Sequence, residues 1–161
     1  MAEPGEITTR SSLDATAADV WSAATSAEGV NFELGPLLSM DIPAGFTGEL
    51  SEVAAGQSLG RSWIRLGGLI PLDFDRITLV EIEVGRRFLE RSTMLSHRLW
   101  EHERTIEPIA KGCVVTDRVR FALRLGAPSS LSRPVLGAVF RHRHSRLRRR
   151  FGGRDLGQAR A

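Results

Sequence analysis

The chain has 161 residues, of which 42% are hydrophobic and 25% charged, and this is ordinary for one globular domain with a real core. No apolar run approaches the roughly 18 residues that a membrane span needs. The opening segment lacks the apolar stretch of a secretory signal, and the single Cys113 cannot form an internal disulfide. We therefore expect a cytoplasmic protein. Because zinc-type Cys/His spacing and a glycine-rich phosphate loop are absent from the sequence, we predict no metal and no cofactor.

The charge is unevenly distributed along the chain. The formal net charge is +3, but residues 132–161 hold nine Arg and one Asp, which gives +8 there and leaves −5 for the rest. The pI near 10.3 reflects the scarcity of groups that titrate above neutrality, since the chain has no Tyr and a single Lys. The pattern is that of a basic C-terminal segment on an acidic body.

The predicted elements can be given in chain order. They are a strand over 6–13, a short helix starting after Thr16, a helix over 27–34, a loop over 37–57 with one short strand at 47–53, strands over 59–66, 75–84 and 87–94, a hairpin over 99–125, and a long helix over 132–151. Thr16 followed by Asp19 resembles a capping box, and Gly35 before Pro36 ends the second helix. Strands joined by short turns imply an antiparallel meander.

The hairpin carries the most informative pattern. Residues two apart share a face of a strand, so one face holds Trp100, His102, Arg104 and Ile106 opposite Asp117, Val119, Phe121 and Leu123. A two-residue turn at Lys111-Gly112 would pair Ala110 with Cys113. In that register Arg104 lies opposite Val119, and Asp117 is its diagonal neighbour. A mixed polar and apolar face of this kind is typical of the wall of a small-molecule cavity.

The last helix has two faces. Its apolar stripe is Val135, Leu136, Val139, Phe140, Leu147 and Phe151, and its basic face is Arg141, Arg143, Arg146, Arg148, Arg149 and Arg150. A curved sheet with one long helix must bury the stripe against the sheet, and a hollow can remain between them. We expect one α+β domain over residues 1–152, with 153–161 as a disordered tail.

Several segments resemble the START-related, polyketide-cyclase-like superfamily, also called SRPBCC or helix-grip proteins. They are ITTRSSLDATAADVW at 7–21, Trp-x-His-x-Arg at 100–104, Asp-x-Val-x-Phe at 117–121 and FRHRHSRLRRRF at 140–151. The last three are similar to a bacterial ligand-binding branch of this superfamily. The resemblance implies an antiparallel sheet of about seven strands that grips the C-terminal helix around an apolar cavity. The iron ligands expected of ring hydroxylase subunits are missing from the sequence.

These observations define the candidate site and the competing functions. The predicted ligand-binding residues are Trp100, His102, Arg104, Asp117, Val119, Phe121, Val139 and Phe140. The favoured function is binding or carriage of a small, mostly hydrophobic molecule. One alternative is a cyclase, aromatase or dehydratase-like enzyme with His102 as general acid/base and Arg104 as oxyanion stabiliser. A structural alternative pairs Arg104 with Asp117 and leaves His102 bonded to a backbone carbonyl.

The basic face of the last helix leaves further partners open. It is a solvated face in the simplest interpretation, and contact with a protein partner or an anionic membrane surface is the next. Nucleic acid is not expected, because no aromatic stacking platform accompanies the arginines. A monomer and a homodimer both remain consistent with the sequence. Glu90, Arg91 and Ser92 lie on a neighbouring strand whose inward face the sequence does not define, and Met40, Phe46 and 69–71 could frame a cavity mouth.

Overall fold

A computed structural model of the chain describes residues 3–41, 43, 52–124 and 127–158. The helices are α1 (Ala17–Ala24), α2 (Ala27–Leu34), the short 3-10 helix η3 (Ser129–Leu131) and α3 (Arg133–Phe151). The strands are β1 (Gly5–Leu13), β2 (Leu38–Met40), β3 (Ser58–Leu66), β4 (Ile70–Glu83), β5 (Arg87–Met94), β6 (His97–Ile109), β7 (Gly112–Leu123) and β8 (Arg154–Gln158). The predicted α+β class is confirmed.

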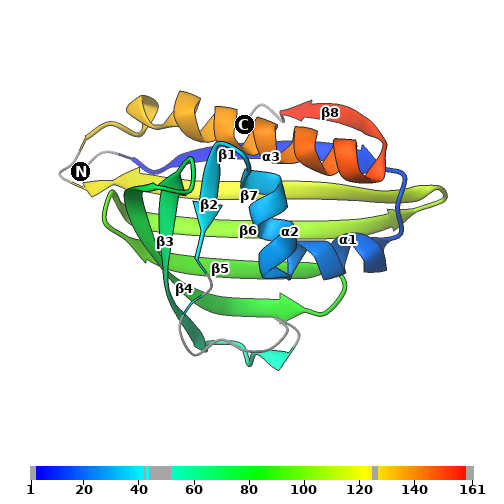
Figure 1. The fold of residues 1–161 in the computed structure, drawn as a ribbon, viewed down its shortest axis with the longest axis horizontal. Coiled ribbons are helices and arrows are strands. Elements are labelled where there is room, and N and C mark those ends of the chain that lie inside the picture. Colours follow the sequence, from blue (N-terminus) through cyan, green and yellow to red (C-terminus); the bar gives the residue numbers. More distant parts are fainter. Residues whose placement is uncertain (1–2, 42, 44–51, 125–126, 159–161) are drawn as a thin grey trace.

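The strands form one antiparallel sheet in the order β2-β3-β4-β5-β6-β7-β1-β8. The predicted meander is therefore present from β3 to β7, and the first strand returns to pair with β7. Helices α1, α2 and α3 lie on one face of the curved sheet, and α3 runs along β1 (Figure 1). The expected grip of a sheet on a long C-terminal helix is confirmed.

Local sequence rules account for the two short helices. Thr16 accepts a hydrogen bond from the Asp19 backbone N–H at 3.1 Å, and Ser26 caps α2 by accepting from the Gly29 N–H at 3.0 Å. Helix α2 has the bounds that the sequence predicts. The region expected to be loop contains the short strand β2, and the strand predicted at 47–53 falls largely on residues 44–51, which lie outside the described part of the chain.

The register predicted for the β6–β7 hairpin is wrong by two residues. Ile109 pairs with Gly112, so the turn is Ala110-Lys111, and Arg104 lies directly opposite Asp117. Gly112 has φ 96°, and a Cβ there would stand 1.9 Å from the Leu13 carbonyl oxygen, so glycine is needed for the approach of β1 rather than inside the turn. A shift of two keeps every side chain on its face, because the period of a strand is two.

The C-terminal tail also differs from the expectation. Residues 154–158, expected to be disordered, form β8, which pairs antiparallel with β1. Gly152 and Gly153 have φ values of 74° and 111°, conformations that allow the chain to turn back from α3. A Cβ on Gly153 would stand 2.0 Å from the Ser12 carbonyl oxygen, so the turn lies directly against β1. The edge of the sheet beyond β1 is thus covered by the segment that follows the long helix.

Two apolar clusters fill the space between sheet and helices. One joins α1, the middle of the sheet and Leu147 of α3, and it includes the fully buried Cys113. The other places Phe140 of α3 against Val119 and Phe121 of β7. On α3, Phe140 and Leu147 are buried as predicted, whereas Val135 is 63% exposed. The helix buries His144 between them, at the four- and three-residue spacing of one helical face.

Candidate functional site

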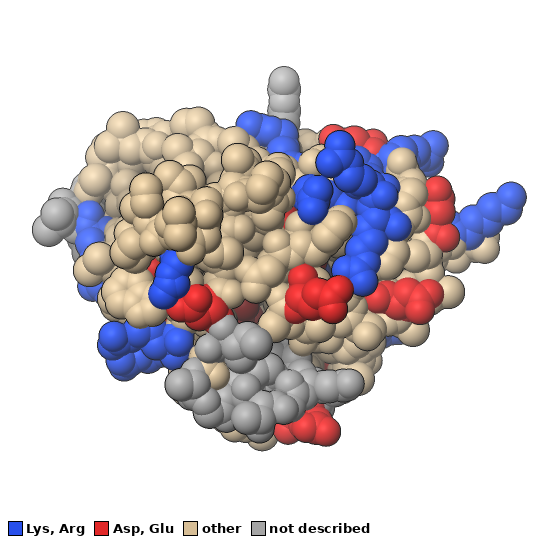
Figure 2. Space-filling view, in the orientation of Figure 1, with Lys and Arg blue, Asp and Glu red and all other residues tan. Residues whose placement is uncertain are grey.

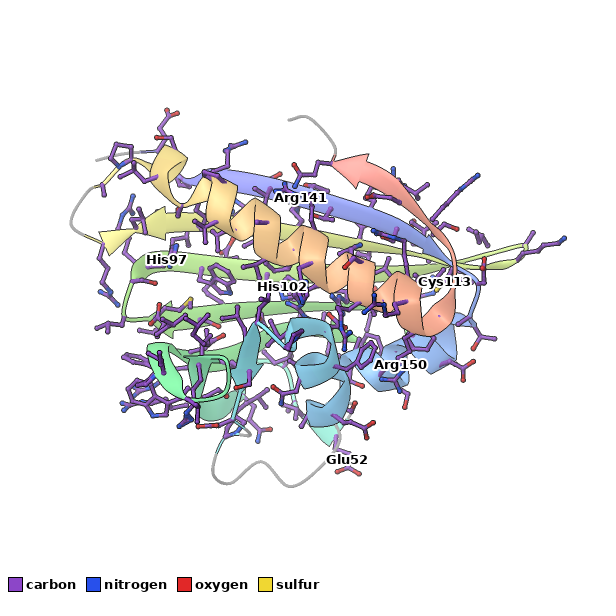
Figure 3. The ribbon with its side chains drawn as sticks, turned by 45° about the horizontal axis from the view of Figure 1, so that its top comes forward. Glu52, His97, His102, Cys113, Arg141 and Arg150 are labelled. Carbon is purple, nitrogen blue, oxygen red and sulfur yellow. The ribbon has the colours of Figure 1, made fainter. Side chains whose placement is uncertain are left out.

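A cavity of about 460 Å³ lies between the curved sheet and the helices. Its wall comes from β3, β4, β5 and β6, and α2, β2 and α3 close it on the other side. Apolar side chains make most of the lining, among them Ile64, Leu79, Met94, Leu136 and Val139. Figure 3 shows His97 and His102 on β6, and the His102 ring lies 5.3 Å from the Phe140 ring of α3. The cavity is large enough for a small organic molecule.

The cavity receives four of the eight predicted ligand-binding residues. Trp100, His102, Val139 and Phe140 line it, and Arg104, Asp117, Val119 and Phe121 do not. Each of these last four residues is at most 1% exposed. The reason is the position of α3, whose Phe140 packs directly on Val119 and Phe121 and closes the space above β7. Inward orientation on the sheet therefore does not by itself place a side chain at the cavity.

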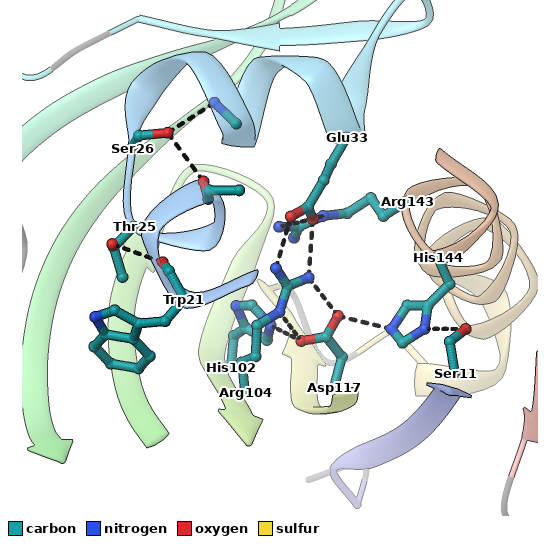
Figure 4. Close-up of polar contacts among 12 residues, drawn as sticks. Ser11, Trp21, Thr25, Ser26, Glu33, His102, Arg104, Asp117, Arg143 and His144 are labelled. Atoms are coloured by element: carbon teal, nitrogen blue, oxygen red, sulfur yellow. Dashed lines mark hydrogen bonds and ion pairs between the residues drawn. The ribbon is translucent and has the colours of Figure 1, made fainter. Parts of the chain in front are cut away.

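Arg104 is fully buried and held by two carboxylates. Its Nε and Nη2 donate to Asp117 Oδ1 and Oδ2, both at 2.7 Å, as the alternative pairing from the sequence anticipates. Its Nη1 and Nη2 donate to Glu33 Oε1 and Oε2 at 2.7 and 2.9 Å (Figure 4). Such bidentate bonds are the strongest that a guanidinium makes. Arg104 thus joins α2 to β7 through its donors.

Asp117 is the centre of a wider network. Besides Arg104, it accepts from His102 Nε2 at Oδ1 and from His144 Nε2 at Oδ2, each at 2.9 Å. His144 Nδ1 lies 2.9 Å from Ser11 Oγ, which also accepts from Arg148. Figure 4 shows how this network crosses from β6 to β1 beneath α3. A buried carboxylate with four donors is the kind of fully satisfied polar group that a core tolerates.

The network shifts the pKa values of its members. Burial raises the pKa of Asp117, but Arg104 and His102 together outweigh burial and hold this pKa well below its usual range. Glu33 behaves alike, with Arg104 and Arg143 lowering its pKa against burial. For Arg104, the same carboxylates overcome burial and raise its pKa well above the usual value. All three groups are therefore charged, and the ion pairs hold α2 and the sheet together.

His102 connects this network to the cavity. Its Nδ1 lies 3.2 Å from Glu90 Oε1, and its Nε2 donates to Asp117, so both ring nitrogens face carboxylates that only accept. Burial lowers the pKa of His102, but Asp117 and Glu90 outweigh it and raise the pKa above 6.5. Opposing burial, His102 lowers the pKa of Glu90. His102 therefore favours its protonated, imidazolium form between two carboxylates. The sequence suggested a bond to a backbone carbonyl, and the two carboxylates take its place.

Four polar atoms at the cavity wall are buried without a hydrogen-bond partner among the described residues. They are Ser62 Oγ, Asp75 Oδ1, His97 Nε2 and Trp100 Nε1. Burial of a polar group without a partner destabilises a fold by roughly 1–3 kcal/mol. Four such groups around one apolar cavity are therefore unusual, and a bound molecule with polar atoms could supply the missing bonds.

Asp75 and His97 have the most specific surroundings of these four. Burial, reinforced by the Glu90 carboxylate, raises the pKa of Asp75 to about 7. His97 Nδ1 lies 2.6 Å from Ser96 Oγ, which donates its proton to Asp73. Burial lowers the pKa of His97, so the ring is neutral with its proton on Nδ1. His97 Nε2 is then a bare acceptor at the cavity wall.

Sequence reasoning missed several of these residues. Glu33 lies in the helix predicted over 27–34, and the sequence gives no sign of its partner Arg104, which is 71 positions away. Asp75 lies within β4 and His97 begins β6, and neither residue belongs to a recognisable motif. His144 had a detectable signal, because it falls on the apolar stripe of α3 between Phe140 and Leu147.

The structure shows which side chains of β5 face the interior, a point that the sequence left open. Glu90 and Ser92 point to the interior, whereas Arg91 is exposed and bonded to Glu101 at 2.9 Å. At the suggested cavity mouth, Met40 lines the cavity and Leu69 is 84% exposed and away from it. Phe46 lies outside the described residues.

The basic face of α3 is partly used by the fold. Arg143 donates to Glu33, Arg146 donates to the Phe32 carbonyl, and Arg148 donates to Ser11. Basic side chains gather over α2 and the C-terminal half of α3, with acidic side chains beside them (Figure 2). No described helix is long and apolar enough to cross a membrane. The described residues contain no group of three or more His, Cys, Asp or Glu that could hold a metal ion.

Solved structures share this architecture at low sequence identity. Protein CV1439 from Chromobacterium violaceum has a TM-score of 0.70 at 11% identity, covering 93% of this chain and 99% of its own. A START superfamily protein from Mycobacterium smegmatis has a TM-score of 0.66 at 10% identity, covering 92% and 96%. Ara h 8.0201 has a TM-score of 0.58 at 12% identity, covering 90% and 98%.

These similarities and the sheet that grips α3 define the class. The chain has the helix-grip fold that the sequence resemblance predicts, and a START superfamily protein shares this fold. Within that class it belongs to the family described as a domain of unknown function (DUF8410), whose sequence profile matches residues 11–151. No curated protein matches the sequence.

Proposed function

We propose that the protein binds a small, mostly hydrophobic molecule in the cavity between the sheet and α3. The observation that carries this proposal is the combination of an apolar cavity of about 460 Å³ with four buried polar atoms that lack partners among the described residues. The apolar lining favours an apolar body, and the polar atoms favour a polar group at one end. The helix-grip fold supports a binding role, since it places such a cavity beneath its long helix.

One of the two residues that the enzyme alternative needs, Arg104, does not line the cavity. Arg104 donates to Glu33 and Asp117, does not line the cavity, and is fully buried. A guanidinium held in this way is unsuited to stabilising an oxyanion on a bound substrate, since its donors are not directed at the cavity. His102 does line the cavity, with both ring nitrogens bonded to carboxylates. We therefore assign His102 a positioning role at the cavity wall.

The binding proposal can be tested with a neutral apolar fluorophore such as Nile red and a variant that fills the cavity. Ile64 lines the cavity and is half-buried, so Ile64→Trp should occupy part of the space and weaken binding at least about tenfold. Leu69→Trp is the matched control, because Leu69 is 84% exposed and does not line the cavity. Native mass spectrometry of the freshly purified protein should also show a retained small molecule.

Two results would overturn the proposal. One is the absence of saturable, one-to-one binding of the neutral fluorophore to the wild-type protein. The other is binding that Ile64→Trp leaves unchanged, since the fluorophore would then lie elsewhere on the molecule.

A further inference from the structure

The charged groups at the cavity wall are not balanced. The basic side chains that line the cavity, His102 and Arg143, already bond carboxylates: His102 bonds Asp117 and Glu90, and Arg143 donates to Glu33 from Nε at 3.0 Å and from Nη2 at 2.9 Å. Two acidic side chains on the same wall, Asp73 and Asp75, have no ion pair to a described residue. Asp73 accepts hydrogen bonds from Ser96 and from the Leu95 backbone N–H, whereas Asp75 Oδ1 has no hydrogen-bond partner among the described residues. Asp75 is therefore left without an ion-pair partner of its own, because the cation whose charge reaches it, His102, is already bonded to Glu90 and Asp117.

Asp75 is built into the wall rather than placed on a surface. It lies on β4 with 4% exposure, between Ser62 of β3 and Met94 of β5 in the register of the sheet. Its Oδ1 is buried with no partner, and so is the neighbouring Ser62 Oγ. Burial raises the pKa of this carboxyl to about 7 against a hydrogen bond from Ser92, so a donor or a cation that enters the cavity would stabilise its carboxylate form. Asp75 lines the cavity, so a small molecule in the cavity can supply this donor or cation.

Other groups at the cavity favour the same chemistry. His97 Nε2 is an acceptor without a partner, because its Nδ1 proton is bonded to Ser96. Rings of Phe88 and Trp100 line the cavity, and the faces of aromatic rings attract cations. Acceptors, an unpaired carboxyl and aromatic rings together are the surroundings that a protonated amine favours. A ligand carboxylate would instead meet Asp75 and Glu90 in a low-dielectric space, where like charges repel strongly.

We infer that the ligand of this cavity is an apolar molecule carrying a protonated amine, with Asp75 as the carboxylate that receives the amine. This inference rests on the proposed binding function and names the chemical class of its ligand. The ammonium would donate to Asp75 and to Ser62 or His97, while the apolar body contacts the aliphatic and aromatic lining. Binding would thereby supply partners to polar atoms that are otherwise buried without them.

The test uses three probes with the same apolar body: naphthylmethylamine, naphthylmethanol and naphthoate. Their affinities for the wild-type chain, Asp75→Asn and Asp41→Asn are measured by isothermal titration calorimetry at neutral pH. Asp41 also lines the cavity, but it is paired with Arg65 at 2.9 Å and its side chain is 45% exposed, so Asp41→Asn is the matched control. Binding of the neutral alcohol reports that the cavity of each variant is intact.

The amine should bind the wild-type chain at least about tenfold more tightly than the carboxylate. Asp75→Asn should remove this preference while leaving alcohol binding within about twofold, and Asp41→Asn should keep it. Equal affinities for amine and carboxylate, or tighter binding of the alcohol than of the amine, would overturn the amine inference and leave the binding function standing. Failure of all three probes to bind would overturn the binding function itself.

Discussion

Removing the Arg104 guanidinium should destabilise the fold far more than removing an exposed arginine. Arg104→Met keeps the length of the side chain and leaves Glu33 and Asp117 buried without their shared partner. Breaking a buried ion pair from one side costs about 3–5 kcal/mol. Each carboxylate retains another donor, Arg143 for Glu33 and the histidines for Asp117. We therefore expect the lower end, about 3 kcal/mol.

Urea unfolding followed by circular dichroism measures this loss, with the slope m checked for constancy. For a chain of 161 residues a loss of 3 kcal/mol corresponds to a fall in Tm of about 6–12 °C. Arg91→Met is the control, because the Arg91 side chain is 56% exposed and its pair with Glu101 should contribute less than about 1 kcal/mol. If Arg104→Met lost no more stability than Arg91→Met, the buried network would not hold α2 to the sheet, and the reasoning would be refuted.

Three further predictions concern pH, the hairpin and the thiol. His102 has a pKa raised above 6.5 in the folded protein, so its stabilising contribution is present below pH 6.5 and is lost as pH rises through the folded pKa. Stability from urea unfolding between about pH 6 and pH 9 should fall more steeply in the wild type than in His102→Gln, and parallel curves would contradict this. Gly112→Ala would place a Cβ 1.9 Å from the Leu13 carbonyl oxygen, so it should lower the free energy of unfolding by more than about 3 kcal/mol. Gly85→Ala, at φ 82° with open space around it, should lower this free energy by about 1–2 kcal/mol. Equal losses for the two variants would count against a close approach of β1 to Gly112. Cys113 is fully buried and burial raises its pKa, so a thiol reagent should label it in urea and not in the native protein, and rapid native labelling would contradict its position.

The local elements of this fold could be predicted because their determinants are near each other in the sequence. The cap at Thr16, the bounds of α2 and β5, and the face shared by Trp100, His102 and Arg104 follow from spacings of two to four residues. The grip of the sheet on the last helix follows from the order of the elements and the apolar stripe of that helix. The register of the hairpin could not be predicted, because a slip of two residues preserves the hydrophobic pattern. The close approach of β1 to Gly112, which favours the observed pairing, is a tertiary contact.

Only the tertiary structure shows which polar residues far apart in the sequence bond one another. Glu33 and Arg104, or Ser11 and His144, lie 71 and 133 positions apart, and no periodic pattern relates them. The site also depends on where α3 crosses the sheet, since that crossing buries Arg104 in a salt bridge and leaves the cavity beside Asp75. Amino-acid spacing determines which face of an element is apolar, whereas the contact between two faces is set by packing of the whole chain.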